Sequence, residues 1–302
     1  MRKGLLGIED LNIEDLELIL DTATHMQEVG QREVKKVPTL RGRTVMNLFF
    51  EPSTRTRTSF EVASKRLSAD VVNFAPGSSS ITKSESILDT AKTLDAMGPD
   101  AVVIRHSVAG VPKRVAEEIS APVINAGDGA NEHPTQALLD MFTIREAKGR
   151  IEGLTVTIVG DIAHSRVARS DIYALTKMGA KVRLAAPLTM LPVDTNNLGV
   201  ESFTSLEAAL PGTDVVMALR IQTERIKEEM VPSVHEYIST FGIGKARLGL
   251  ANEGALLMHP GPVNWGVELS PELVDYPFNM VLRQVRNGVA IRMAALYLCI
   301  GQ

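Results

Sequence analysis

The 302-residue sequence contains one cysteine, Cys299, and few aromatic side chains, which make up 4% of the chain. A single cysteine excludes an intrachain disulfide framework or a cysteine-based zinc site, and it fits a reducing compartment. No stretch approaches the roughly 18 uncharged apolar residues of a membrane-spanning helix. Near the N-terminus, acidic residues precede any apolar run of the signal-peptide kind. We therefore expect a cytoplasmic protein that makes no use of a membrane.

An excess of basic residues is missing as well. The chain has 32 Lys and Arg against 36 Asp and Glu, a formal net charge of −4. General nucleic-acid binders usually carry a basic surface, so we expect no nucleic-acid partner. The hydrophobic fraction of 44% is typical of globular proteins. The length predicts about two domains, because single cores rarely grow past about 250–300 residues.

Eight apolar runs of strand length alternate with stretches of helical periodicity. They occupy residues 44–50, 71–75, 101–105, 123–126, 154–160, 181–185, 214–219 and 255–259. Most runs are continuous rather than alternating, as expected for strands buried on both faces. This alternation predicts an α/β fold with parallel sheets flanked by helices.

We expect two such domains. The first would comprise residues 1–132, with a C-terminal helix at 288–302 packing back on it, and the second residues 133–287. A two-domain α/β chain offers a cleft between its domains, a common place for small-molecule sites. The active site is therefore expected in the interdomain cleft.

A polar segment, residues 49–61, begins where an apolar run ends and leads into a helix-period stretch. Pro52 suits a helix start because its missing N–H group costs nothing there. The following N–H groups and the helix dipole favour an anion, and hydroxyls and a guanidinium add donors suited to phosphate. These donors belong to Ser53, Thr54, Arg55 and Thr56. The alternative is a capped helix with solvated arginines, or with Arg57 holding Glu51 or Glu61.

The Ser-Thr-Arg-Thr-Arg run resembles the carbamoyl-phosphate signature of the aspartate/ornithine carbamoyltransferase family. Later motifs follow the family's order over nearly the whole chain. They are Lys83 in a Ser-rich loop, Arg105, His-Pro-Thr-Gln at 133–136, Arg166, Arg-Ile-Gln at 220–222 and His-Pro-Gly-Pro at 259–262. A single motif of this kind can arise by chance, but the whole set in this order is hard to explain without a relationship to the family.

Carried over residue by residue, the resemblance implies a carbamoyl-phosphate site. Its residues are Ser53, Thr54, Arg55, Thr56, Ser79, Lys83, Arg105, His133, Gln136, Gly261 and Pro262. The catalytic residues among them are Arg55, Thr56, Lys83, Arg105 and His133. In the family, the residues matching Ser79 and Lys83 reach into the next subunit's site. The resemblance therefore implies a homotrimer with shared sites.

Several of these residues have plainer interpretations on their own. A strand-end arginine such as Arg105 more often forms a surface ion pair, and residues 77–85 read as a solvated loop. His133 is equally a helix-entry residue, and Gln136 a solvated amide. If the site is real, the charges of Arg55 and Arg105 disfavour an imidazolium, so His133 is expected to be a neutral hydrogen-bond donor.

Aspartate brings two carboxylates and calls for two cationic or amide clamps. Arg166 follows one apolar run, and Arg220 with Gln222 follows another, so each is expected at a ligand-facing turn. The resemblance adds Lys83 to these aspartate-binding residues. Ornithine would need an acidic partner, and the family's ornithine motifs, Asp-x-x-x-Ser-Met-Gly and His-Cys-Leu-Pro, are absent from this chain.

Two other interpretations compete in this half of the chain. Arg166 would alternatively form a helix-start ion pair with Asp161 or Asp171. A strand followed by Gly160 also suggests a dinucleotide site, but the second and third glycines of G-x-G-x-x-G are missing, so we rank it far lower.

Two prolines in four residues make 259–262 a rigid turn in which a cis Gly261–Pro262 bond is plausible. By resemblance the turn offers backbone carbonyls to the carbamoyl NH₂ and the attacking amine. Relatives often carry Leu at the position of Gly261, or Arg at that of Trp265. A backbone role survives the first change, whereas any charge role at the second position is in doubt.

The expected activity is carbamoyl transfer from carbamoyl phosphate to L-aspartate, in pyrimidine biosynthesis, with no metal and no cofactor. One alternative is a carbamoyltransferase for another amine, such as ornithine or N-acetylornithine. Another is a catalytically silent family member that acts as a scaffold. A regulatory subunit or a dihydroorotase-like partner stays open.

Overall fold

The computed structural model describes residues 4–74, 86–193, 195, 198–221 and 233–301. The chain divides into two compact units, one formed by Met1–Phe142 with Arg286–Gln302 and the other by Thr143–Val285. The chain thus passes between the units within helix α5 (Pro134–Lys148) and again within α10 (Val281–Ile300). The expected division after residue 132 instead falls inside α5, which the sequence pattern placed wholly in the second domain.

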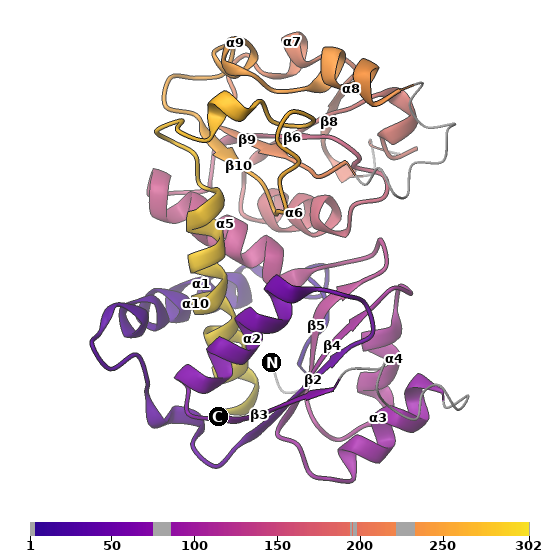
Figure 1. Ribbon diagram of the computed structural model, residues 1–302, viewed down its shortest axis with the longest axis vertical. Coiled ribbons are helices and arrows are strands. Elements are labelled where there is room, and N and C mark those ends of the chain that lie inside the picture. The colour runs from indigo at the N-terminus through magenta and orange to yellow at the C-terminus, as the bar shows by residue number, and fades with distance from the viewer. Residues whose placement is uncertain (1–3, 75–85, 194, 196–197, 222–232, 302) are drawn as a thin grey trace. The chain divides into compact units, whose positions relative to one another are not determined.

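The first unit is built on a five-stranded parallel sheet in the order β1-β5-β4-β2-β3. Its strands are β1 (Gly4–Leu5), β2 (Thr44–Phe49), β3 (Asp70–Phe74), β4 (Ala101–His106) and β5 (Val123–Asp128). Its other helices are α1 (Ile13–Gln31), α2 (Thr54–Arg66), α3 (Ile87–Asp95) and α4 (Val111–Glu118). In Figure 1, α3 and α4 lie on one side of this sheet, and α2 and α10 on the other.

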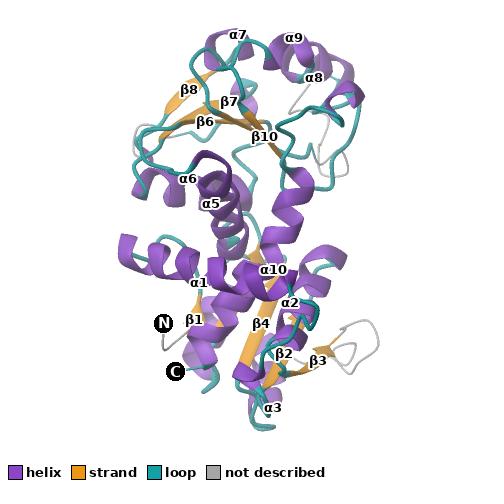
Figure 2. Ribbon diagram, turned by 90° about the vertical axis from the view of Figure 1, so that its left-hand side faces the viewer, coloured by secondary structure: helices purple, strands orange, loops and turns teal. Residues whose placement is uncertain are grey.

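The second unit contains another five-stranded parallel sheet, ordered β10-β9-β6-β7-β8. Its strands are β6 (Thr155–Val159), β7 (Lys181–Ala185), β8 (Glu201–Phe203), β9 (Val215–Ala218) and β10 (Leu256–Met258). Its helices are α6 (Arg166–Lys177), α7 (Leu206–Ala209), α8 (Val234–Phe241) and α9 (Lys245–Leu248). Figure 2 shows α6 beneath this sheet and α7, α8 and α9 above it.

The predicted fold class is confirmed: both sheets are parallel and both are flanked by helices. All eight apolar runs form strands. The sequence pattern missed β1 and β8, which have two and three residues and lie at sheet edges. Neither strand gives an apolar run of strand length, because β1 has only two residues and β8 is Glu-Ser-Phe with its first two residues exposed.

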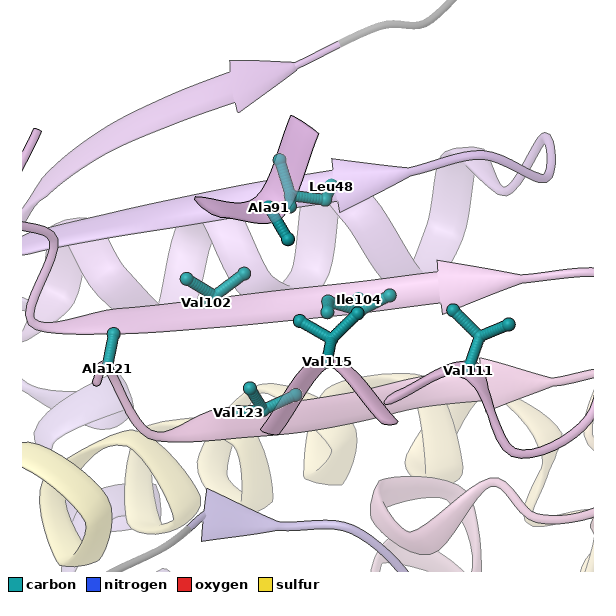
Figure 3. Packing of buried hydrophobic residues seen from close by; sticks show 8 residues of the cluster. All are labelled: Leu48, Ala91, Val102, Ile104, Val111, Val115, Ala121 and Val123. Atoms are coloured by element: carbon teal, nitrogen blue, oxygen red, sulfur yellow. The ribbon is translucent and has the colours of Figure 1, made fainter. Parts of the chain in front are cut away.

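A buried cluster in the first unit shows how one face of its sheet is covered. Val102 and Ile104 of β4 pack with neighbouring apolar side chains of α3 and α4 (Figure 3). Successive residues of a strand point to opposite faces, so Arg105 leaves this cluster and turns to the other side. The same alternation that buries the aliphatic residues therefore directs the arginine.

Helix α2 begins directly after the polar segment that follows β2. Phe60 and Ala63 are fully buried, and Thr56 is nearly so, a spacing that keeps one helix face on the sheet. This burial fixes the position of the helix N-terminus.

Among the described residues, we find no helix with the length and hydrophobicity that crossing a membrane would require.

Candidate active site

Three predicted binding segments follow neighbouring strands of the first sheet. Residues 53–56 follow β2, Arg105 lies near the end of β4, and His133 follows β5. These strands are adjacent and parallel, in the order β5-β4-β2. Carboxyl ends of parallel strands share one edge of a sheet, where α/β proteins place ligands. The topology therefore brings together residues that are far apart in the sequence.

The N-terminus of α2 has the features of an anion site. Ser53 precedes the helix, but its side chain does not cap it, contrary to the capped-helix alternative. Arg55 is exposed, whereas Thr56 is only 8% exposed. The first-turn N–H groups and the positive end of the dipole therefore remain suited to an anion.

Both glutamates that the alternative assigned to Arg57 hydrogen-bond other cations, and Arg57 acts on Glu61 only as one of the smaller charges that lower its pKa. Glu61 accepts from Lys65 at 2.6 Å, and this hydrogen bond chiefly lowers the pKa of the Glu61 carboxyl. Glu51 pairs with Arg105 at 3.0 Å.

Arg105 is held from two sides. Its guanidinium donates to the carbonyl oxygen of Ala126 at 3.2 Å and to Glu51 Oε1 at 3.0 Å. The side chains of Arg105 and Glu51 are 12% and 15% exposed, so the pair is mostly buried. The ion pair of the plainer interpretation is present, but it is mostly buried near the end of β4 rather than on the open surface. Glu51 and the Ala126 carbonyl fix the direction of the guanidinium.

His133 and Gln136 lie at the start of α5 and are 4% and 8% exposed. The Gln136 amide nitrogen donates to both oxygens of Asp140, at 3.2 and 3.1 Å. The solvated-amide alternative is therefore wrong. Because the nitrogen faces Asp140, the amide oxygen points the other way and can accept from a ligand N–H. Asp140 lies one helical turn after Gln136, and this four-residue spacing is a feature of the sequence from which their contact could have been predicted.

Sequence reasoning missed Arg292 of α10, a buried cation that supports the same unit. It is 4% exposed, donates to Ser59 Oγ at 2.9 Å, and lies over the Phe60 ring at 5.2 Å. Burial, with the charge of Arg105, lowers the pKa of Arg292 to about 10. The group therefore stays protonated at neutral pH and adds positive charge behind α2.

The predicted arginines of the second unit also share a sheet edge. Arg166 is the first residue of α6, which follows β6, and Arg220 lies two residues beyond β9. The strands β6 and β9 are neighbours and parallel, so the two arginines emerge at the same edge. Both arginines are partly buried. Two cations at one edge suit a ligand with two carboxylates.

Asp161, one of the two proposed ion-pair partners of Arg166, is engaged by a histidine. Its Oδ1 contacts the ring Nδ1 of His164 at 2.9 Å and accepts from the His164 backbone N–H at 3.3 Å. The helix start is capped independently, since Ser165 Oγ accepts from the backbone N–H of Ala168 at 3.1 Å.

The His-Pro-Gly-Pro segment forms a turn after β10 with a cis Gly261–Pro262 peptide bond, as anticipated. Gly261 has φ of +71°, a conformation that L side chains rarely adopt. A leucine would be strained at this φ, so the glycine suits this backbone. Three of the predicted site residues, Ser79, Lys83 and Gln222, lie outside the described residues. Among the described residues, no group of three or more metal-ligating side chains is present.

Comparison with known proteins gives concordant matches for both halves. Residues 3–146 match the aspartate/ornithine carbamoyltransferase family's carbamoyl-P binding domain, and residues 152–299 match its Asp/Orn binding domain. The aspartate carbamoyltransferase catalytic subunit of Syntrophotalea carbinolica is 57% identical over 299 residues, covering 99% of this chain and 96% of that protein. Its counterpart from Pelotomaculum thermopropionicum is 56% identical, with 99% and 97% covered.

Comparison with solved structures leads to the same enzyme as the sequence relatives. The chain is similar to aspartate transcarbamoylase from Trypanosoma cruzi in complex with carbamoyl phosphate and aspartate, with a TM-score of 0.90 and 33% identity. That match covers 98% of this chain and 96% of the other. The same enzyme in complex with N-(phosphonacetyl)-L-aspartic acid also has a TM-score of 0.90.

Proposed function

The chain belongs to the aspartate/ornithine carbamoyltransferase family, and from this we propose that it transfers the carbamoyl group of carbamoyl phosphate to L-aspartate. The products are N-carbamoyl-L-aspartate and phosphate, as in pyrimidine biosynthesis. One observation carries the assignment beyond the family match. Residues 53–56, Arg105 and His133 lie at or just beyond the carboxyl ends of three adjacent parallel strands, which is where an anionic substrate would meet all of them.

Carbamoyl phosphate is assigned to the first unit. Its phosphate is bound by Ser53, Thr54 and Arg55, through hydroxyls, the guanidinium and the N–H groups of α2. The Gln136 oxygen, oriented by Asp140, accepts from the carbamoyl NH₂. The backbone carbonyls of Gly261 and Pro262 are assigned to the same NH₂ and to the attacking amine.

Aspartate is assigned to the cations of the second unit. Arg166 binds one carboxylate, and Arg220 with Gln222 binds the other, while Lys83 contributes to both substrates. A bidentate arginine matches a carboxylate in geometry as well as charge. Ornithine, whose side chain ends in an ammonium, would be repelled by the same pair of arginines. This charge logic favours aspartate within the family.

In the reaction, the aspartate amine attacks the carbamoyl carbon and the bond to the phosphate oxygen breaks. Thr56, Arg105 and neutral His133 donate to the oxygen on which negative charge develops. Donors of this type contribute about 10²–10³ each to the rate. The amine proton passes to the departing phosphate, and Lys83 neutralises the charge of that phosphate. Binding both substrates side by side supplies the remaining advantage of proximity.

The proposal includes a homotrimer in the cytoplasm, with Ser79 and Lys83 reaching the neighbouring subunit's site. It rests on the resemblance of the Ser-rich loop to its counterpart in the family, since both residues lie outside the described part of the chain.

The deciding experiment measures phosphate release from carbamoyl phosphate with L-aspartate, ornithine or N-acetylornithine as acceptor. Of the three acceptors, we expect only aspartate to support turnover. The Arg55→Ala variant should lose turnover and bind carbamoyl phosphate more weakly. Release with ornithine would reassign the acceptor. No release with any acceptor from the folded protein would identify a silent scaffold, and near-normal activity of Arg55→Ala would overturn the site assignment.

A further inference from the structure

A buried histidine–glutamate pair lies behind the Gly261–Pro262 turn. His259 and Glu268 are each 1% exposed, and His259 Nε2 lies 3.2 Å from Glu268 Oε1. Placing a carboxylate in the interior is costly unless its charge is compensated. The proposed mechanism uses neither side chain. A pair this deeply buried next to a predicted substrate-binding turn calls for a reason.

Hydrogen bonding determines which ring nitrogen of His259 carries the proton. The backbone N–H of Gly261 donates to Nδ1 at 2.8 Å, so Nδ1 is an acceptor and has no proton. The proton of the neutral ring is therefore on Nε2, which donates to Glu268. His259 is thus a neutral bridge between a backbone N–H group of the turn and a buried carboxylate.

Glu268 extends this bridge to the segment that carries Arg220. Its Oε1 also accepts from the backbone N–H of Asn264 at 2.6 Å. The Asn264 side-chain amide then donates to the carbonyl oxygen of Ile221 at 3.2 Å, and Ile221 directly follows Arg220. One carboxylate oxygen therefore ties together the turn with the predicted carbamoyl contacts and the segment with a predicted aspartate clamp.

We propose that His259 and Glu268 are positioning residues that hold the Gly261–Pro262 turn and the Arg220 segment in a fixed mutual arrangement. The inference rests on the proposed function, because it gives those two segments their ligands. The backbone of His259 is anchored separately, since its N–H donates to Gln284 Oε1 at 2.9 Å. Substitutions of the ring therefore test the bridge itself rather than the path of the chain.

Two variants separate the two ends of the bridge. In His259→Asn the amide oxygen takes the place of Nδ1 and keeps the bond from Gly261, while the link to Glu268 is lost. In His259→Gln the amide nitrogen takes the place of Nε2 and keeps the link to Glu268, while Gly261 loses its acceptor. One hydrogen bond changes a rate or binding constant by up to about tenfold.

We expect His259→Gln to lower kcat by about tenfold with little change in the aspartate KM, because the turn touches the reacting groups. His259→Asn should instead raise the aspartate KM by about tenfold, because Glu268 loses the bond that ties it, and with it the Asn264 link to the Arg220 segment, to the turn. Glu268→Gln keeps an acceptor oxygen and should stay within about threefold of the parent in both constants. His235→Asn, an exposed histidine of α8, serves as the matched control and should change neither.

A purely structural pair would give a different result. Both His259 variants would then lower the melting temperature and shift kcat and KM in parallel, or leave both unchanged, and either outcome overturns the proposal. A second measurement does not depend on activity. In the ¹⁵N spectrum of histidine-labelled protein, the signals lost in His259→Gln should show protonated Nε2 and bare Nδ1, and the opposite tautomer would refute the bridge. Absence of phosphate release by the parent protein would refute the proposed function instead.

Discussion

Three buried or nearly buried acids orient side chains at or behind the predicted site: Glu51 bonds Arg105, Asp140 bonds Gln136, and Glu268 bonds His259 behind the Gly261–Pro262 turn. Each acid restricts its partner to one direction, which reduces the entropy lost when a ligand binds. Only Asp140 lies within one helical turn of its partner. Glu51 is 54 residues from Arg105, and no local pattern could have paired them.

Arg220→Ala tests the division of labour between the two groups of cations. The variant should raise the aspartate KM at least tenfold and leave the carbamoyl-phosphate KM within about twofold, because it removes a charge-assisted contact to one substrate only. Steady-state phosphate release with each substrate varied in turn provides the measurement. A rise in the carbamoyl-phosphate KM alone would place Arg220 at the other ligand.

Tyr237 of α8 carries a buried hydroxyl that has no hydrogen-bond partner among the described residues. Burial, with the nearby charges of Glu268 and Asp161, raises the pKa of this phenol, so it stays neutral. Tyr237→Phe removes an unsatisfied polar group, and we expect the free energy of unfolding to stay equal or to rise by up to about 1 kcal/mol.

Tyr276→Phe is the matched control for that substitution. Its hydroxyl donates to the carbonyl oxygen of Ala255 at 2.9 Å, so removal should cost about 1 kcal/mol. Urea denaturation of both variants gives the comparison. A larger loss of stability in Tyr237→Phe than in Tyr276→Phe would show that the Tyr237 hydroxyl has a partner.

At the level of elements, α10 links the end of the chain to the helix that carries the predicted phosphate site. Arg292 contacts Ser59 and Phe60 of α2, and residues 286–302 group with the first unit. A C-terminal helix can therefore influence the phosphate site without touching a ligand. Its periodicity was visible in the sequence, but the destination of its buried arginine was not.

The only cysteine of the chain reports on the docking of α10. Burial raises the pKa of the Cys299 thiol to about 12. At pH 8 only about 10⁻⁴ of the thiol is then ionised, and the thiolate is the reactive form. We expect a thiol reagent to label the native protein far more slowly than the protein in guanidinium chloride, where reaction is immediate. Full labelling of the native protein within minutes would show that the C-terminal end of α10 is not packed against the rest of the first unit.

At the level of the whole molecule, the two units repeat one principle. In each, a parallel sheet presents predicted binding residues after adjacent strands, β5-β4-β2 in the first and β9-β6 in the second. The proposed function divides the chemistry between the units, with the predicted phosphate donors in one and the predicted carboxylate-binding arginines in the other. A net charge of −4 is compatible with anionic substrates, because Arg55 and Arg105 lie at one of these edges and Arg166 and Arg220 at the other.

A mixing experiment tests the proposed sharing of sites between subunits. Lys83→Ala and Arg55→Ala should each be inactive alone. If Lys83 serves a neighbouring subunit's site, hybrids contain some sites with both native residues, and mixing after dissociation should restore part of the activity. Equal mixtures of parent and Arg55→Ala subunits control for recovery from dissociation. Hybrids that form but stay inactive would place Lys83 in its own subunit's site.

The sequence by itself determined the fold class, eight of the ten described strands and the motifs that identify the family. These follow from local causes: continuous apolar runs, helix-start chemistry and the order of short motifs along the chain. The edge strands β1 and β8 left no such signal, because one has two residues and the other carries exposed polar side chains, so only pairing with a neighbour defines them.

Only the tertiary structure decided which side chains hold the ligand-binding residues in place. The pairing of Arg105 with Glu51, of Arg292 with Ser59, and of His259 with Glu268 arises from segments that the fold brings together. A buried charge must be compensated by whatever group lies next to it, and that group is chosen by packing rather than by sequence separation. Motifs therefore identify candidate residues for substrate binding, whereas three-dimensional packing decides the direction in which those residues point.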